Sequence, residues 1–242
     1  MILFLGHRLR YHIAWFGATG KTRATQYRNM GKRERRPKTS ASRPAPRDCT
    51  RPVVGLRIIG GRFRGRKLHY SGDLRTRPMK DRLREAIFNL VGPLPPGTQA
   101  WDLFAGTGAL GLEALSRGAE RATFLEQHYP TADIIRQNIA ALGVAEQADV
   151  VTGNVFIGWP RPTAAAPADK PWLVFCSPPY DFYVRRTEEM LNLIVGLIRA
   201  APVTSLFVVE ADERFDFQTL PNPAEWDVRV YPPATVGIYR KE

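Results

Sequence analysis

Short apolar runs recur along residues 99–240, and most are continuous rather than alternating. A continuous run of this kind is typical of a strand buried on both faces, as in a parallel sheet. Apolar residues at helical spacing follow the first run, through Leu112 and Leu115, and recur over 188–199. The pattern predicts an α/β domain with helical crossovers early and an antiparallel pair at the end. Its seven strands are expected at 99–104, 122–125, 149–152, 172–176, 206–210, 226–231 and 235–240.

The region before this domain has a pattern of its own. Two short strands around Gly60 and Gly61 predict a hairpin-like element. A helix is expected from about 79 to 91, because its apolar stripe has helical spacing, and Pro78 suits its first turn. Residues 92–97 form a Pro/Gly-rich linker. Basic side chains of the hairpin and of the helix entrance are candidates for contacts with a polyanion: Arg62, Arg64, Arg66, Lys67, Arg75 and Arg77.

The N-terminal stretch lacks such a pattern. Residues 1–54 are rich in arginine and show no apolar periodicity beyond the first five, which predicts a disordered basic arm. The apolar start is too short for a signal peptide, and Arg8 and Arg10 follow it too soon. The chain is therefore expected to comprise this arm, a hairpin-and-helix part over 55–97 and a main domain over 98–242.

Charge is unevenly distributed along the chain. The net charge of +12 divides into +10 over residues 1–50, +8 over 51–91 and −6 over 92–242. A basic front half on a mildly acidic main domain is typical of a protein that binds nucleic acid. The alternative is a merely solvated basic surface. It suits residues 1–50 better than 57–84, where arginines alternate with strand and helix formers.

Composition narrows the class of protein further. No apolar run approaches the length of a membrane span, which is about 18 residues. The two cysteines, Cys49 and Cys176, cannot form a disulfide framework, and Cys176 falls in a predicted buried strand. We therefore expect a cytoplasmic protein with reduced thiols. No Cys/His cluster has the spacing of metal ligands, so no metal is expected.

A glycine-rich turn follows the first strand of the main domain. Gly106-x-Gly108-x-x-Gly111 lies between that strand and a helix, and Glu126 ends the second strand. Glycines permit a tight turn and a close approach of the backbone to a ligand. An acidic residue at the end of the second strand can accept hydrogen bonds from both hydroxyls of a ribose. NAD-dependent oxidoreductases and S-adenosylmethionine (SAM)-dependent methyltransferases both fit this order of elements.

Two features favour the methyltransferase. Asp102, inside the first strand, suits the cationic amine of a methionyl group, whereas it would repel a dinucleotide pyrophosphate. Hydride transfer usually requires a catalytic His or a Tyr-x-x-x-Lys sequence. None of the 4 histidines follows a later strand of the domain, and the sequence contains no Tyr-x-x-x-Lys.

The tetrapeptide Ser177-Pro178-Pro179-Tyr180 directly follows the apolar run 172–176. Two consecutive prolines remove two backbone donors and fix two φ angles, so the loop is stiff and its carbonyls face away from the sheet. Such a loop can accept hydrogen bonds from an amino group while the ring stacks on a flat base. It resembles the (Asp/Asn/Ser)-Pro-Pro-(Tyr/Phe/Trp) motif of methyltransferases that act on exocyclic amino groups of nucleobases. An ordinary proline turn is the alternative.

A wider resemblance joins these motifs. Residues 57–68, 76–89 and 102–119 and the Pro-Pro-Tyr loop are together similar to the bacterial 16S rRNA guanine-N2 methyltransferases of the RsmD type. The resemblance implies a class I SAM-dependent, Rossmann-like fold with an N-terminal hairpin. It implies methyl transfer from SAM to the exocyclic N2 of a guanine in small-subunit rRNA, as in the guanine(966)-N(2) enzymes. We expect a monomer whose partner is 16S rRNA or the small ribosomal subunit.

The resemblance also implies roles for individual residues. Ser177 Oγ and the Pro178 carbonyl would accept from guanine N2–H, while Tyr180 stacks on the base. Glu126 would hold the adenosyl ribose, with the adenine near Asn154. The implied catalytic residues are Ser177, Pro178, Pro179 and Tyr180. The implied cofactor-binding residues are Asp102, Phe104, Ala105, Gly106, Thr107, Gly108, Glu126, Gln127, Asn154 and Val155.

Two positions depart from the family pattern. Ser177 stands where the family usually has Asp, and Asn154 stands where it usually has Asp at the end of the third strand. Both side chains can still accept a hydrogen bond, but neither carries a negative charge. Two alternatives stay open: an amino methyltransferase acting on DNA adenine or protein glutamine, and a non-catalytic rRNA-binding or assembly factor that keeps the fold.

Overall fold

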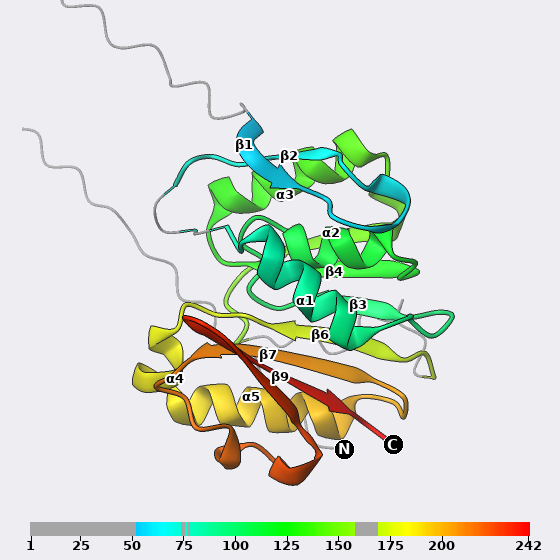
Figure 1. Cartoon of the computed structure of the whole chain (residues 1–242). Coiled ribbons are helices and arrows are strands. Elements are labelled where there is room, and N and C mark those ends of the chain that lie inside the picture. Colours follow the sequence, from blue (N-terminus) through cyan, green and yellow to red (C-terminus); the bar gives the residue numbers. More distant parts are fainter. Residues whose placement is uncertain (1–51, 74–75, 77, 158–168) are drawn as a thin grey trace, which may run out of the picture. The chain divides into compact units, whose positions relative to one another are not determined.

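The computed structural model describes residues 52–73, 76, 78–157 and 169–242 (Figure 1). These residues belong to one compact unit. Residues 1–51 of the arm expected over 1–54 lie outside the described residues, as do Arg75, Arg77 and residues 158–168, a Pro/Ala-rich stretch before the fourth predicted strand.

The centre of the fold is a single seven-stranded sheet, which confirms the predicted strand number. Its order is β5-β4-β3-β6-β7-β9-β8, and β9 runs in the direction opposite to the other six strands. The predicted closing antiparallel pair is therefore confirmed, with β9 inserted between β7 and β8. The strands are β3 Gln99–Asp102, β4 Arg121–Glu126, β5 Ala148–Thr152, β6 Trp172–Cys176, β7 Leu206–Asp212, β8 Asp227–Tyr231 and β9 Ala234–Arg240.

Helices cover both faces of this sheet and form two hydrophobic cores. Successive side chains of a strand point to opposite faces, and on β6 Leu173 and Phe175 join one core while Val174 and Cys176 join the other. Figure 1 shows α1, α2 and α3 on one side of the sheet and α5 on the other. The helices are α1 Asp81–Val91, α2 Ala109–Ser116, α3 Tyr129–Leu142, α4 Asp181–Arg185 and α5 Thr187–Ala200.

The predicted start of α1 was wrong by two residues. Lys80 has an extended backbone, with φ −61° and ψ 140°, and the helix begins at Asp81. Pro78 therefore lies before the helix rather than in its first turn. The Asp81 carboxylate accepts from Arg84 at 2.9 Å, one turn along the helix. This ion pair stabilises the first turn, where an acidic side chain also suits the helix dipole.

The predicted hairpin is present, but its turn is longer than expected. β1, Pro52–Arg57, pairs antiparallel with β2, Lys67–His69, and a short 3-10 helix, Gly61–Phe63, lies between them. The tight turn expected at Gly60 and Gly61 is therefore part of a broad connection. β1 also begins at Pro52, so residues 52–54 belong to the hairpin and the disorder predicted for them was wrong.

Helix α2 explains why position 61 of the connection is a glycine. The buried Glu113 carboxylate accepts from the backbone N–H of Ile59 at 2.8 Å and of Gly60 at 2.7 Å. Gly61 has φ +72°, and a Cβ atom there would lie 1.9 Å from the Ser116 carbonyl oxygen. Only glycine allows this approach, so the hairpin is docked on α2 through its backbone.

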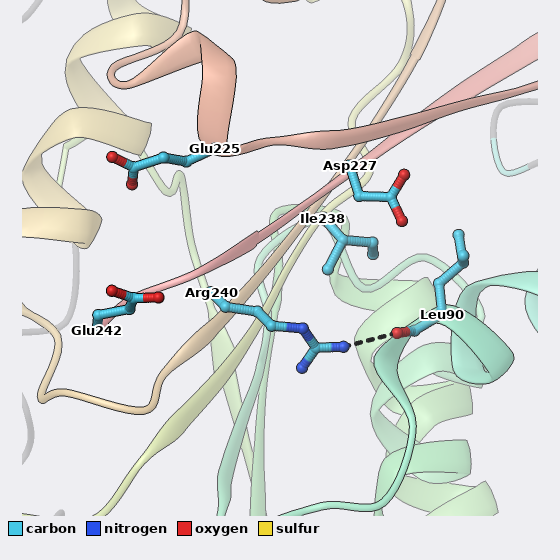
Figure 2. Close-up of a pocket in the computed structure, with 6 residues that line it drawn as sticks. All are labelled: Leu90, Glu225, Asp227, Ile238, Arg240 and Glu242. Atoms are coloured by element: carbon cyan, nitrogen blue, oxygen red, sulfur yellow. Dashed lines mark hydrogen bonds between the residues drawn. The ribbon is translucent and has the colours of Figure 1, made fainter.

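The C-terminal strand holds the other end of this part of the chain. Arg240 of β9 donates a hydrogen bond to the carbonyl oxygen of Leu90 at 2.8 Å (Figure 2). It also donates to the carbonyl oxygen of Val91 at 3.2 Å. Carbonyls of the last helical turn have no partner within the helix, so Arg240 supplies the end of α1 with a donor. Among the described residues, no helix has the length and apolar character that a membrane crossing requires.

Candidate active site

The strand order reverses between β3 and β6, and a cleft of about 980 Å³ opens where these strands and their neighbours end. In open α/β sheets this switch point is the usual ligand site. The cleft is lined from the ends of β3, β4, β5 and β6, from β7, from the approach to α1 and from the β8–β9 turn. Its residues include Thr76, Met79, Lys80, Arg82, Phe104, Gly106, Glu126, Gln127, His128, Asn154, Val155, Phe156, Ser177, Pro178, Pro179, Tyr180, Phe182, Glu210, Tyr231, Pro232 and Pro233.

The glycine turn sits at the floor of this cleft. Gly108 adopts the left-handed conformation, with φ 72°, directly before α2. Its N–H donates to the Ala105 carbonyl at 2.6 Å, while Ala105 N–H donates to the Leu125 carbonyl of β4 at 2.9 Å. Gly106 lines the cleft, whereas Ala105, Thr107 and Gly108 form the turn without lining it. The turn thus holds the end of β3 against the end of β4.

Glu126 ends β4 with its carboxylate held in place by two backbone groups. Oε2 accepts from Gly106 N–H at 2.9 Å, and Oε1 accepts from His128 N–H at 2.8 Å. Each carboxylate oxygen can accept a further hydrogen bond. Because Glu126 lines the cleft, it presents a positioned acceptor pair to a ligand, as the ribose-binding prediction requires.

Asp102 lies behind the cleft rather than in its lining. Its side chain is buried, and its Oδ2 accepts from Gly111 N–H at 3.0 Å. Burial raises the pKa of Asp102 to about 7. The negative charge of the nearby Glu126 also raises this pKa, whereas the hydrogen bond from Gly111 lowers it. In this structure Asp102 therefore ties α2 to β3, and its contact with a methionyl amine stays a prediction.

The expected adenine subsite lies at the end of β5. Asn154, Val155 and Gln127 all line the cleft. The Asn154 side-chain oxygen accepts from Phe156 N–H at 3.0 Å, which fixes its orientation. An amide oxygen has a second lone pair, so Asn154 can still accept from an amino group.

An aromatic cluster that was not predicted from the sequence forms one wall. The rings of Phe104, Phe156 and Phe182 lie with their centroids 6.0 Å from one another. The Arg186 guanidinium lies 3.9 Å from the Phe156 ring centroid. Of the three rings, the sequence predicts only Phe104 as a site residue, because Phe156 and Phe182 are far apart in sequence and belong to no local motif. The cluster gives the cleft an apolar surface between the β5 and β6 ends.

The Ser-Pro-Pro-Tyr loop faces the cleft and is bound to a residue of the next strand. Ser177 Oγ donates a hydrogen bond to Oε2 of Glu210, and Tyr180 OH donates to Oε1 at 2.7 Å. Glu210 of β7 is itself buried and lines the cleft. Sequence reasoning placed this residue at a strand end and gave it no role.

The predicted basic side chains lie on the hairpin, and two of them contact the main domain. Arg62 donates to the Gln147 side chain and covers the Phe63 ring, while Arg66 donates to the Ala141 carbonyl at 2.6 Å. Arg64 and Lys67 are exposed, and nothing is described for the two arginines at the helix entrance. Two further basic residues, Lys80 and Arg82, line the cleft and were missed.

The remaining polar groups provide no metal site in the described part of the chain, where no three His, Cys, Asp or Glu side chains gather as metal ligands would. Cys176 is buried, and burial raises the pKa of its thiol to about 12. Such a thiol stays protonated and is a poor nucleophile. Cys49 lies outside the described residues.

Comparison with known proteins agrees with this geometry. The family model described as Conserved hypothetical protein 95 matches residues 56–230. The ribosomal RNA small subunit methyltransferase D of Escherichia coli K12 is 36% identical over 193 residues, which cover 77% of this chain and 90% of the relative. The putative rRNA methyltransferase YlbH of Bacillus subtilis is 33% identical over 145 residues, covering 59% and 73%.

A solved structure matches over the same region. The putative methyltransferase yhhF from Escherichia coli has a TM-score of 0.58 and 35% sequence identity, covering 77% of this chain and 98% of that one. The expected class I, Rossmann-like methyltransferase fold is therefore confirmed. With most of its length inside the family model and a long match to a methyltransferase D, the chain belongs to the Conserved hypothetical protein 95 family, the family of the RsmD-type methyltransferases.

Proposed function

We propose that the protein transfers a methyl group from SAM to the exocyclic N2 of a guanine in small-subunit rRNA, acting as a cytoplasmic monomer. Family membership makes it a SAM-dependent rRNA methyltransferase. The choice of an exocyclic amino nitrogen as the methyl acceptor rests on one observation, the Ser-Pro-Pro-Tyr loop that faces the cleft with an aromatic ring and a buried carboxylate behind it.

The cofactor half of the cleft suits SAM. Glu126 presents two carboxylate oxygens that backbone N–H groups hold in position, and Asn154 presents an oriented amide. The cleft is large enough for a nucleoside ligand and a base together. When bound, SAM supplies an activated methyl group, so the protein mainly needs to position the amino nitrogen.

The loop supplies the groups that position an amino nitrogen. The two prolines contribute no N–H, so their carbonyls and the Ser177 hydroxyl are acceptors for an amino donor. The Tyr180 ring can stack on a base that has left its helix, as base-modifying enzymes require. Adenine and cytosine also carry exocyclic amino groups, and the assignment to guanine follows the family resemblance.

RNA would contact basic side chains in two places. Lys80 and Arg82 line the cleft. Arg62, Arg64, Arg66 and Lys67 lie on the hairpin, where Arg62 and Arg66 contact Gln147 and Ala141, near the end of α3 and the start of β5. Contacts from such side chains to phosphates position the nucleic acid without reading its sequence. We therefore assign residues 55–97 to the RNA side and 98–242 to the methyltransferase domain, with Arg75 and Arg77 as further candidates.

The test is methyl transfer in vitro with nucleoside analysis. Purified protein, isotope-labelled SAM and small subunits from cells that lack this activity are incubated, and the rRNA is digested to nucleosides for mass spectrometry. Labelled N2-methylguanosine is the expected product. Label in another nucleoside, in ribosomal protein or in no product would overturn the proposal.

The same assay separates the two alternatives left open by the sequence. Duplex DNA and ribosomal proteins, offered in parallel, would take the label if the enzyme methylates adenine or glutamine instead. A non-catalytic assembly factor would bind the subunit and transfer no label to any substrate. A reaction without the protein serves as the control for background methylation.

A further inference from the structure

Glu210 is the least expected group in the cleft. It lies on β7, one residue beyond Val209, which pairs with Cys176 of β6. This register sets Glu210 beside Ser177, the first residue of the loop. The side chain is buried, and in the described part of the chain no Lys or Arg forms an ion pair with it. Burying a carboxylate without a cationic partner is costly, and buried ionisable groups in a cleft are candidates for function.

The contacts of Glu210 determine whether the hydroxyl groups of the loop donate or accept hydrogen bonds. An ionised carboxylate only accepts hydrogen bonds, so both hydroxyls that contact it must donate. Ser177 Oγ–H and Tyr180 O–H each have one proton, and both protons point at Glu210. Both hydroxyl oxygens are therefore left with lone pairs only. Together with the proline carbonyls, they make an acceptor surface.

We propose that Glu210 is a positioning residue that turns the Ser-Pro-Pro-Tyr loop into an amino-selective acceptor. This inference deepens the proposed function and rests on it. A base amino group donates two hydrogen bonds and meets acceptors, whereas a ring carbonyl at the same place meets only lone pairs. Glu210 also brings a negative charge to a loop whose first residue, Ser177, has none. That charge favours the positive charge that develops on the attacking nitrogen.

The decisive variant is Glu210→Gln, which keeps the size of the side chain. A glutamine amide can donate as well as accept, so the Ser177 and Tyr180 protons are no longer confined to one direction. At saturating SAM we expect the single-turnover rate of methyl transfer to fall about 100-fold. The dissociation constant for SAM should stay within about twofold, because Glu126 and Asn154 are unchanged.

A matched control and a rescue variant separate this role from simple loss of structure. Glu213→Gln removes an exposed carboxylate three residues further along and should leave the rate unchanged. The double variant Ser177→Asp/Glu210→Gln returns a carboxylate to the loop. Its single-turnover rate should be at least about tenfold higher than that of Glu210→Gln alone. Loss of SAM binding or of thermal stability in Glu210→Gln, without rescue, would assign Glu210 a structural role and overturn the proposal.

A binding measurement tests amino selectivity without catalysis. GMP and IMP differ only in the N2 amino group, and their affinities for the protein saturated with S-adenosylhomocysteine can be measured by NMR titration. The parent should prefer GMP by about three- to tenfold, the value of one or two hydrogen bonds. Glu210→Gln should bind the two nucleotides equally.

The two measurements distinguish failure of this inference from failure of the proposed function. The parent protein and Glu210→Gln could methylate rRNA equally fast and both prefer GMP. That result would overturn the role of Glu210 and leave the proposed function intact. The parent could instead transfer no methyl group and still prefer GMP, with the preference lost in Glu210→Gln. That result would overturn the proposed reaction and support the amino-selective loop. Equal binding of GMP and IMP by the parent overturns the inference directly.

Discussion

Arg84 and Glu113 form an ion pair in the core, with 3.7 Å between Nε and Oε2 and with both side chains 0% exposed. Arg84 also donates to the Arg57 carbonyl at 2.6 Å and to Asp81 at 2.9 Å. Burial lowers the pKa of Arg84, and the two carboxylates oppose that effect. One pair therefore joins α1, the hairpin and α2, so the hairpin and α1 share a core with the main domain.

Removing one charge of this pair should destabilise the fold strongly. Glu113→Gln leaves the buried Arg84 with Asp81 as its remaining carboxylate partner and removes the ion pair with Arg117. It also weakens the anchor of Ile59 and Gly60. We expect the free energy of unfolding to fall by about 3 kcal/mol, measured by urea denaturation. The control is Asp133→Asn, which breaks an exposed pair with Arg136 and should cost under about 1 kcal/mol. Equal effects would contradict the assignment.

Glu126 should dominate cofactor affinity. Its carboxylate is oriented by Gly106 and His128, and hydrogen bonds to charged groups contribute about 1.5–3 kcal/mol each. Glu126→Ala should therefore weaken SAM binding at least about tenfold in calorimetry. Unchanged SAM affinity, or tight binding of NAD by the parent, would contradict the ribose role.

The hairpin should contribute phosphate contacts. Replacing Arg62, Arg64, Arg66 and Lys67 with Ala should weaken rRNA binding and lower the log–log salt slope by about 0.7–0.9 for each lost contact. Because Arg62 and Arg66 also contact the main domain, the Arg64→Ala/Lys67→Ala pair tests exposed side chains alone. SAM affinity is the internal control. An unchanged slope would mean that these side chains are only a solvated surface.

Tyr180 should act mainly through its ring. Tyr180→Phe loses the bond to Glu210 and keeps the stacking surface, whereas Tyr180→Ala loses both. Base stacking contributes about 1–3 kcal/mol. The alanine variant should therefore slow single-turnover methyl transfer substantially more than the phenylalanine variant does. Both should bind SAM normally. Equal rates in the two variants would place the contribution in the hydroxyl group instead.

Asp102 should make stability depend on pH. Its raised pKa, about 7, means that the folded protein retains a proton that the unfolded chain loses near the ordinary value of 3.8. Stability therefore falls as pH rises across this window, by up to about 1.4 kcal/mol per pH unit. Asp102→Asn removes this titration and should flatten the dependence in urea unfolding between pH 5 and pH 7.5. An unchanged pH dependence in the variant would show that other groups cause it.

The strands were predictable because a buried strand appears in the sequence as a short run of consecutive apolar residues. β6 was predicted to the residue, since five consecutive apolar positions occupy both faces of a covered sheet. α3 was overlooked, although Ile135, Ile139 and Leu142 have helical spacing. The five-residue α4 is too short to show a period at all.

The candidate site divides in the same way. The glycine turn, Glu126 and the Ser-Pro-Pro-Tyr loop lie within local motifs and were found. Glu210 was not, because its contacts with Ser177 and Tyr180 span 33 and 30 residues and depend on the β6–β7 register. The position of Asp102 behind the cleft instead of in its lining was also unpredictable, since no local pattern says which face of a central strand borders the cleft.

The β8–β9 turn forms a wall of the cleft, and it is translated after the other residues that line the cleft. Proteins are made from the N-terminus, so a nascent chain that has emerged only through β7 carries Glu126, the loop and Glu210. It still lacks Tyr231, Pro232 and Pro233, which line the cleft. It also lacks Arg240, whose bonds to Leu90 and Val91 hold the end of α1. Translation of the final hairpin is thus the step that completes the substrate cleft.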